Sequence, residues 1–245
     1  MPSEEWFKNW FDSPYYHLLY ANRSDKEARD FVQHLIAAFQ WPQNTRLLDL
    51  ACGKGRHAVA FAEAGLDVTG LDLSRNSIES AKVYEHDRLH FYIHDMRHAF
   101  RSNYYQVVCN LFTSFGYFLS HHEHLQVARN MAMALKPGGI LILDFVNRAA
   151  ARRNIDGLRH EKLEKEGVQF EILRSYSDER FEKEIIVTDS GKTYHFKESL
   201  ASFSLDEMTS LFLPQGLTLV NVYGDYQLAN YNEESSPRMI LQFKK

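Results

Sequence analysis

The chain has 245 residues, of which 44% are hydrophobic and 24% charged, and its formal net charge is −4. Because domains that neutralise many phosphates are usually basic, this charge gives no reason to expect a nucleic-acid partner. The sequence has no run of 18 apolar residues, and its N-terminus lacks the basic and apolar regions of a signal peptide, which predicts a cytoplasmic protein without a membrane partner.

The N-terminal half of the chain alternates between helical and strand patterns. The segment 25–40 is expected to be a helix, and its residues Phe31, Leu35 and Phe39 recur on one face. Further helices are expected at 55–64, 74–85 and 122–135, and strands at 46–50, 67–73, 89–96, 105–112 and 140–146. Strands that alternate with helices predict a mostly parallel sheet that is covered on both faces.

The pattern changes beyond residue 147. The segment 148–158 fits a short helix or a loop. Three further segments alternate apolar and polar residues and are separated by turn signals, at 168–177, 180–189 and 192–203. Such alternation predicts an antiparallel meander with one solvated face, inserted between the fifth and sixth strands of the main sheet.

The C-terminal part returns to helix and strand. Ser204 and Glu207 have the spacing of a capping box, which predicts a helix over 204–216. Two final strands, at 217–223 and 238–243, would complete the main sheet. The expected organisation has four parts: an N-terminal lid over the site (1–24), a core (25–147), an inserted antiparallel β subdomain (148–203) and a C-terminal helix with strands (204–245).

The first of these parts repeats a Trp-Phe pair at a four-residue step, in Trp6-Phe7 and Trp10-Phe11. In a helix this step places both pairs on one face. Three roles agree with this pattern: a lid over a bound substrate, a contact between two copies of the chain, and an arm packed on the core.

The stretch "TRLLDLACGKGRH", residues 45–57, joins the first strand to a helix through two glycines. A Walker loop needs a Lys followed by Ser or Thr after its last glycine, whereas Lys54 lies between the glycines. A dinucleotide fingerprint can be fitted if Ala58 is its third small residue, but Asp49 would then lie beside a pyrophosphate. S-adenosylmethionine has no phosphate and carries a positive amino group, which agrees better with an acidic residue at this position.

Other polar residues end the following strands, where open α/β sheets bind ligands. Asp72 would hold the ribose hydroxyls, Asp95 the adenine amino group, and Asn110 lies at the same edge. Each also has a structural alternative, because Asp49 and Asp72 could cap helices and Asp95 could begin a turn.

The motifs "LLDLACGKGRH", "VTGLDLS", "HDMR" and "NLFTSFGYF" resemble the successive motifs of the class I S-adenosylmethionine-dependent methyltransferases. Within that superfamily, "YYHLLYANRSDKEA" and "FTSFGYF" resemble the small-molecule branch that includes amino-sugar N-methyltransferases. The resemblance covers about residues 14–147 and implies a Rossmann-like α/β fold with a seven-stranded, mostly parallel sheet and an antiparallel β insertion after the fifth strand. Beside Asp49, it implies these residues at the cofactor: Tyr16, Tyr20, Arg23, Ala51, Gly53, Gly55, Asp72, Leu73, Asp95, Met96, Asn110 and Phe112.

Aromatic residues and histidines near the fourth and fifth strands are the expected contacts of the methyl acceptor. Phe115, Tyr117 and Phe145 would form an aromatic wall, although a hydrophobic core explains them equally well. His121 and His122 are the candidate catalytic bases, with a solvated helix start as the alternative and no base needed for a free amine. No second set of ligands accompanies "HHEH", so no metal site is expected.

These observations predict an S-adenosylmethionine-dependent methyltransferase that acts on a small molecule, with a preference for an amine nitrogen. The alternatives are an RNA or protein methyltransferase, a cofactor-binding module without catalysis, and a nicotinamide oxidoreductase. We expect a monomer or a homodimer.

Overall fold

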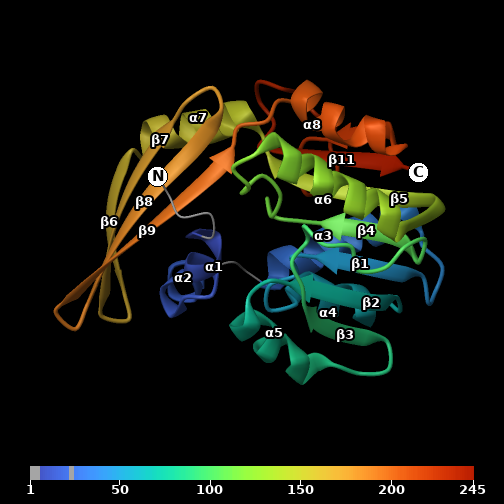
Figure 1. The fold of residues 1–245 in the computed structure, drawn as a ribbon, viewed down its shortest axis with the longest axis horizontal. Coiled ribbons are helices and arrows are strands. Elements are labelled where there is room, and N and C mark those ends of the chain that lie inside the picture. The colour runs from blue at the N-terminus through green and yellow to red at the C-terminus, as the bar shows by residue number, and fades with distance from the viewer. Residues whose placement is uncertain (1–5, 22–24) are drawn as a thin grey trace.

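The computed structural model describes residues 6–21 and 25–245 (Figure 1). Within these residues lies a seven-stranded sheet with a second, four-stranded sheet beside it. The strands of the main sheet are, in spatial order, β10 (Thr218–Tyr223), β11 (Arg238–Lys244), β5 (Leu135–Val146), β4 (Tyr105–Asn110), β1 (Arg46–Leu50), β2 (Asp67–Asp72) and β3 (Leu89–Ile93). Neighbours from β3 to β5 are parallel, and β11 is antiparallel to both β5 and β10. The predicted fold class is confirmed.

Helices cover both faces of the main sheet. On one face pack α3 (Asp25–Phe39), α4 (Arg56–Glu63) and α5 (Arg75–Ala81), and on the other α6 (His121–Ala134) and α8 (Leu205–Phe212). Adjacent residues of β1 serve the two layers, because side chains alternate across a strand. Leu47 belongs to the cluster of Phe31 and Phe61, whereas Leu48 belongs to that of Met131 and Leu211.

Two element boundaries differ from the sequence expectation. The helix expected at 74–85 ends earlier and continues as the short 3-10 helix η1 (Lys82–Tyr84). The residues 136–139, which the sequence places between the helix at 122–135 and the strand at 140–146, lie instead inside β5, which begins at Leu135 directly after α6. A shift in the pairing of β4 with β5 between Tyr105 and Val107 accommodates the extra residues, and Gly138 there has a φ of +78°.

The second sheet lies between β5 and β10 in the sequence. It follows α7 (Arg148–Gly157) and contains β6 (His160–Lys165), β7 (Val168–Tyr176), β8 (Arg180–Asp189) and β9 (Lys192–Ala201), all antiparallel to their neighbours. The antiparallel insertion is therefore present, with one strand more than expected. The missed strand β6, "HEKLEK", alternates only between exposed and half-buried side chains, so its pattern has no apolar face.

The N-terminal helices α1 (Trp6–Phe11) and α2 (Pro14–Leu19) lie between the inserted sheet and the main sheet (Figure 1). Phe7 and Trp10 are buried, and Phe7 makes an edge contact with Phe118 at 6.1 Å between ring centroids. The side chain of Trp6 lies outside the described residues. A further 3-10 helix, η2 (Leu213–Gln215), follows α8. In the described part of the chain, no helix is long and apolar enough to span a bilayer.

Candidate functional site

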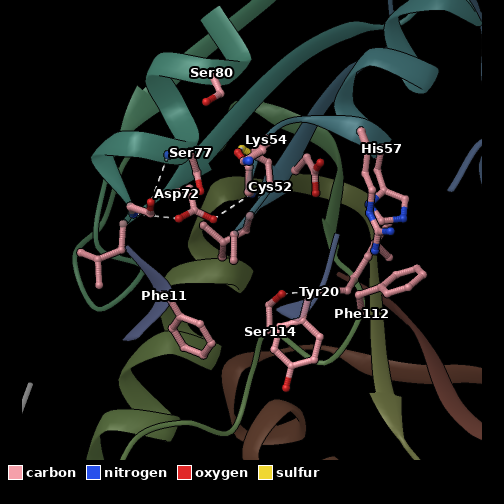
Figure 2. A pocket seen from close by; sticks show the side chains of 18 of the residues that line it. Phe11, Tyr20, Cys52, Lys54, His57, Asp72, Ser77, Ser80, Phe112 and Ser114 are labelled. Carbon is pink, nitrogen blue, oxygen red and sulfur yellow. Dashed lines mark hydrogen bonds between the residues drawn. The ribbon is translucent and has the colours of Figure 1, made fainter. Parts of the chain in front are cut away.

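A cavity of about 590 Å³ opens at the carboxyl ends of β1 and β2, beside the loop that follows β4 (Figure 2). After β1 the chain builds β2 and β3 on one side, and then returns to place β4 on the other side. Open α/β sheets bind their ligands at such a reversal of strand order, because the loops diverge there and leave a crevice. The N-terminal helices close this crevice from the opposite side, where Phe11 and Tyr20 lie across the cavity from Asp72 in the view of Figure 2.

The two glycines of the loop after β1 have different tasks. Both have positive φ, +56° at Gly53 and +85° at Gly55. A Cβ at Gly53 would meet no atom within 4 Å, so this glycine leaves its backbone open to the cavity. A Cβ at Gly55 would lie 2.7 Å from Cζ of Phe91. Gly55 thus permits the close packing of α4 on the sheet, and the structure does not bring it to the cavity wall.

Asp72 ends β2 and connects this loop to α5. Its Oδ2 accepts a hydrogen bond from the backbone N–H of Gly53, and its Oδ1 accepts one from Ser74, both at 2.8 Å. Burial raises the pKa of Asp72, although these backbone hydrogen bonds oppose the shift. Each carboxylate oxygen can accept a second hydrogen bond, so ribose hydroxyls could still bind here.

Asp49 and Asn110 lie in the buried floor beneath the loop. Asp49 lines the cavity, and its Oδ2 has no hydrogen-bond partner among the described residues. Burial first, and then the charge of Asp72, raise the pKa of Asp49 to about 7. Asn110 donates through Nδ2 to the carbonyl of Leu50 at 2.8 Å and does not itself line the cavity. Arg56 and a backbone hydrogen bond with Ala58 oppose the rise in the pKa of Asp49 only in part, and its unsatisfied Oδ2 suits a ligand that carries a positive charge.

Asp95 lines the cavity and also begins a turn. Its carboxylate accepts a hydrogen bond from the Arg97 backbone at 2.9 Å and pairs with Nη2 of Arg97 at 2.7 Å. Burial alone would raise the pKa of Asp95, but the contacts with Arg97 hold it below its ordinary value. Asp95 therefore begins a turn, as its structural alternative predicted, and it also lies at the cavity wall, where its contact with adenine stays a prediction. The remaining predicted cofactor residues at the cavity wall are Tyr16, Tyr20, Ala51, Leu73, Met96 and Phe112. Arg23 lies outside the described residues.

Aromatic rings form the side of the cavity away from Asp72. The ring centroid of Phe11 lies 5.1 Å from that of Tyr16 and 5.0 Å from that of Tyr117. The structure does not bring Phe115 and Phe145 to this wall. Both are fully buried and pack on Phe203. Phe115 lies in the loop after β4 and Phe145 in β5, and both belong to the buried cluster beneath α6 and α8.

The histidines at the cavity are not those expected from the sequence. His121 and His122 are exposed in the first turn of α6 and do not line the cavity. His17 and His57 do, and their Nε2 atoms have no partner in the part of the chain that is described. Burial, and then Lys54, lower the pKa of His17; burial, and then Arg56, lower that of His57. Both imidazoles are therefore neutral at pH 7.

The comparisons with known proteins agree with this geometry. A family model described as a methyltransferase domain matches residues 47–139. YqeM of Bacillus subtilis (strain 168) is 35% identical over 109 residues, which are 42% of this chain and 43% of YqeM. The dTDP-3-amino-3,4,6-trideoxy-alpha-D-glucopyranose N,N-dimethyltransferase of Streptomyces venezuelae is 29% identical over 132 residues, 53% of this chain and 54% of that enzyme. The chain thus spans about half the length of these two relatives.

Among solved structures, an S-adenosylmethionine-dependent methyltransferase from Clostridium acetobutylicum ATCC 824 has the same fold. Its TM-score is 0.78 at 15% identity, over 94% of this chain and 95% of that one. Residues 47–139 therefore match a methyltransferase domain, and the chain has the fold of S-adenosylmethionine-dependent methyltransferases.

The residues of the cavity fit S-adenosylmethionine, the cofactor expected from the sequence. Oδ2 of Asp49 has no hydrogen-bond partner among the described residues and offers a counter-charge to a ligand with a positive amino group, and Gly53 leaves room for close contact with the backbone. Asp72 offers hydrogen-bond acceptors to hydroxyl groups, and Leu73 and Met96 offer apolar contact to a base. Within the described residues, no group of three or more His, Cys, Asp or Glu could hold a metal ion.

One feature that shapes the cavity could not be recognised in the sequence. Asp144 of β5 is fully buried and accepts hydrogen bonds from the Phe112 backbone at 2.7 Å and from Nε of Arg238 at 2.8 Å. Arg238 also donates to Oγ1 of Thr113 at 2.8 Å. Phe112 and Thr113 have φ values of +58° and +61°, so this pair holds a left-handed turn at the cavity wall. The pairing depends on β11 lying beside β5, which no local pattern indicates.

Proposed function

We propose that this protein transfers the methyl group of S-adenosylmethionine to a small molecule, at an amine nitrogen. The observation that carries the proposal is the aromatic side of the cavity, where Phe11, Tyr16 and Tyr117 gather. Ring faces attract a cationic or polarised amine without adding charge. The cavity volume of about 590 Å³ is in the range of small-molecule sites. The name of the Streptomyces relative, an N,N-dimethyltransferase, supports nitrogen as the acceptor.

When bound, S-adenosylmethionine supplies a methyl group on a positively charged sulfur, which keeps the electron pair of the broken carbon–sulfur bond. Asp49 would hold the amino group by its charge, and Asp72 would accept hydrogen bonds from the ribose. The aromatic wall excludes water and presents no carboxylate to the sulfur, so the positive charge that the reaction removes is not over-stabilised. Positioning then becomes the main contribution of the protein.

An acceptor that arrives as an ammonium ion must lose one proton before its nitrogen can attack the methyl group, and His17 is our candidate to receive that proton. His17 lies on α2 at the cavity, and its Nε2 has no hydrogen-bond partner among the described residues. Because burial and Lys54 lower the pKa of His17, the imidazole is neutral at pH 7 and can accept a proton. This assignment replaces the one based on His121 and His122.

The first test is calorimetric titration with S-adenosylmethionine, S-adenosylhomocysteine and NADH. Wild-type protein and Asp67→Ala should bind both adenosyl ligands and not NADH, whereas Asp72→Ala should lose binding. Asp67 is a matched control, because it begins the strand that Asp72 ends and pairs only at the surface with Arg46, at 3.7 Å. Binding of NADH alone by folded protein would refute the methyltransferase function.

The second test follows the transfer of a labelled methyl group to matched amines and alcohols, to RNA and to protein. The proposal expects transfer to small amines. Transfer only to alcohols, RNA or protein would contradict it, and tight cofactor binding without any transfer would indicate a binding module. His17→Gln should lower the turnover rate on ammonium-form acceptors, whereas His121→Gln, at the exposed start of α6, should not.

A further inference from the structure

The inserted sheet contributes no residue to the cavity wall, yet it is hydrogen-bonded to the helices that do. None of the described residues that line the cavity comes from 148–203. Six come from the N-terminal helices α1 and α2 and the residues directly after them: Phe7, Phe11, Tyr16, His17, Tyr20 and Ala21. The position of this part of the wall therefore depends on what holds the N-terminal helices.

A buried ion pair of the inserted sheet binds these helices. Nζ of Lys183 on β8 lies 2.7 Å from Oε2 of Glu198 on β9. Oε1 of the same Glu198 accepts a hydrogen bond from Nε1 of Trp10 and another from the hydroxyl of Tyr20, both at 2.8 Å. Lys183 also donates to the Tyr20 hydroxyl.

The hydrogen bonds from Trp10 and Tyr20 also stabilise the buried ion pair of Lys183 and Glu198. Only 12% of the Glu198 side chain is exposed, and burial by itself would raise its pKa. Lys183, Tyr20 and Trp10 together hold that pKa below its ordinary value, so Glu198 is ionised at neutral pH. A buried ion pair is favourable only when further hydrogen bonds satisfy its atoms. Release of α1 and α2 would remove two of the contacts that satisfy Glu198.

The other side of this segment is held by the core. Oδ1 of Asp12 accepts hydrogen bonds from Oγ of Ser74 at 2.6 Å and from the backbone of Asn76 at 3.1 Å. Both donors lie at the start of α5, directly beyond Asp72. The residues 10–20 are thus hydrogen-bonded to the inserted sheet through Trp10 and Tyr20, and to the cofactor-binding edge of the core through Asp12.

We propose that Glu198 and Lys183 are positioning residues for the cofactor cavity. They act through Tyr20 and Trp10, and the inserted sheet thereby controls the affinity for the cofactor without touching it. The inference rests on the proposed function, because the ligand measured is the adenosyl cofactor. It gives the inserted sheet a role in cofactor affinity, although the sheet contributes no described residue to the cavity wall.

The test compares Glu198→Gln with Glu182→Gln. Glu182 lies beside Lys183 in β8, and its partner Lys197, at 2.9 Å, is the neighbour of Glu198 in β9. Unlike Glu198, the side chains of Glu182 and Lys197 are each about one third exposed. Glu198→Gln should raise the Kd for S-adenosylhomocysteine by about tenfold, as for the loss of a hydrogen bond to a charged group. Glu182→Gln should change that Kd by less than about twofold. Hydrogen exchange of residues 7–20 should accelerate in the first variant alone.

A merely structural role would give a different pattern. It would lower the melting temperature of Glu198→Gln while the folded fraction keeps the wild-type Kd and the wild-type exchange of residues 7–20; this result would overturn the inference. Glu198→Asp should restore part of the affinity. In a Tyr20→Phe background, Glu198→Gln should have a smaller effect than in wild type, because the two act through one contact.

Two further outcomes are decided by the same measurements. If Glu198→Gln does not fold, Tyr20→Phe removes only the hydroxyl that contacts Glu198, and a Kd within about twofold of wild type would reject the inference. If wild-type protein binds no adenosyl ligand, the proposed function fails, and the exchange of residues 7–20 in Glu198→Gln still supports or rejects the positioning role.

Discussion

At the scale of single residues, Asp49 shows most clearly how a binding site differs from a core. The fold buries its carboxylate, which is 1% exposed, and leaves Oδ2 without a partner in the described ranges. Burial and the nearby Asp72 raise the pKa of Asp49 to about 7. A buried acid with one oxygen unsatisfied lowers the stability of the folded state, so its presence is explained better by a cationic ligand than by folding.

Cofactor binding near neutral pH should therefore release a proton from Asp49. At pH 7 about half of the ligand-free molecules hold this proton, and a positive ligand group favours the ionised form. Titrations in buffers of different ionisation enthalpy should show release of about half a proton. Asp49→Asn should release none, and a wild-type enthalpy that is the same in every buffer would contradict the assignment.

The same residue predicts how the stability of the ligand-free protein depends on pH. The folded state holds the Asp49 proton up to about pH 7, whereas the unfolded chain releases it near its ordinary pKa of 3.8. Stability from this group is therefore greatest below pH 4 and decreases as the pH rises to 7. Asp49→Asn removes the dependence and should stabilise the ligand-free protein at pH 8, by up to about 4 kcal/mol. Urea unfolding at pH 5 and 8 measures it, and equal gains at both would be evidence against it.

At the scale of elements, the contacts that shape the site join segments that are distant in sequence. Asp144 of β5 and Arg238 of β11 hold the turn at Phe112, which follows β4. Hydrophobic runs made β1 to β5 predictable, and strand ends indicated Asp49 and Asp72. No local pattern states which strand lies beside β5, so the Arg238 contact required the structure.

Asp144→Asn should both destabilise the protein and weaken the cofactor site. The change leaves the Arg238 guanidinium, whose side chain is only 16% exposed, without its counter-charge, which costs about 3–5 kcal/mol. Urea unfolding and the Kd for S-adenosylhomocysteine give the two readouts.

Asp178→Asn is the control, since Asp178 is 97% exposed in its pair with Arg152 and should change stability by less than about 0.5 kcal/mol. Replacing Arg238 by Met in Asp144→Asn should recover part of the loss, because the unpaired buried charge is gone. A loss below about 1 kcal/mol in Asp144→Asn alone would contradict the role of the pair.

At the scale of the whole molecule, the two sheets share one core, and this limits what the sequence could reveal. Phe170 and Ile185 of the inserted sheet belong to the same buried cluster as Trp10 and Leu143. Phe115 lies in this cluster too, although its place beside the aromatic loop suggested an acceptor contact. An apolar residue after a strand has the same pattern in a core and in a pocket wall, so only packing separates them.

A shared core predicts that the inserted sheet unfolds together with the main sheet rather than before it. Ile185→Ala removes a fully buried side chain of β8 and should cost about 2–5 kcal/mol. Because the cluster is continuous through Trp10, this loss should lower one cooperative transition for the entire chain. The two probes are circular dichroism and the fluorescence of Trp10, in a Trp6→Phe, Trp41→Phe background. Their urea midpoints should agree with each other before the substitution, and they should agree again, at a lower urea concentration, after it. If the Trp10 signal instead changed at lower urea than the circular dichroism, the inserted sheet and the N-terminal helices would form a separate unit, and Glu198 would then act across a boundary that opens independently.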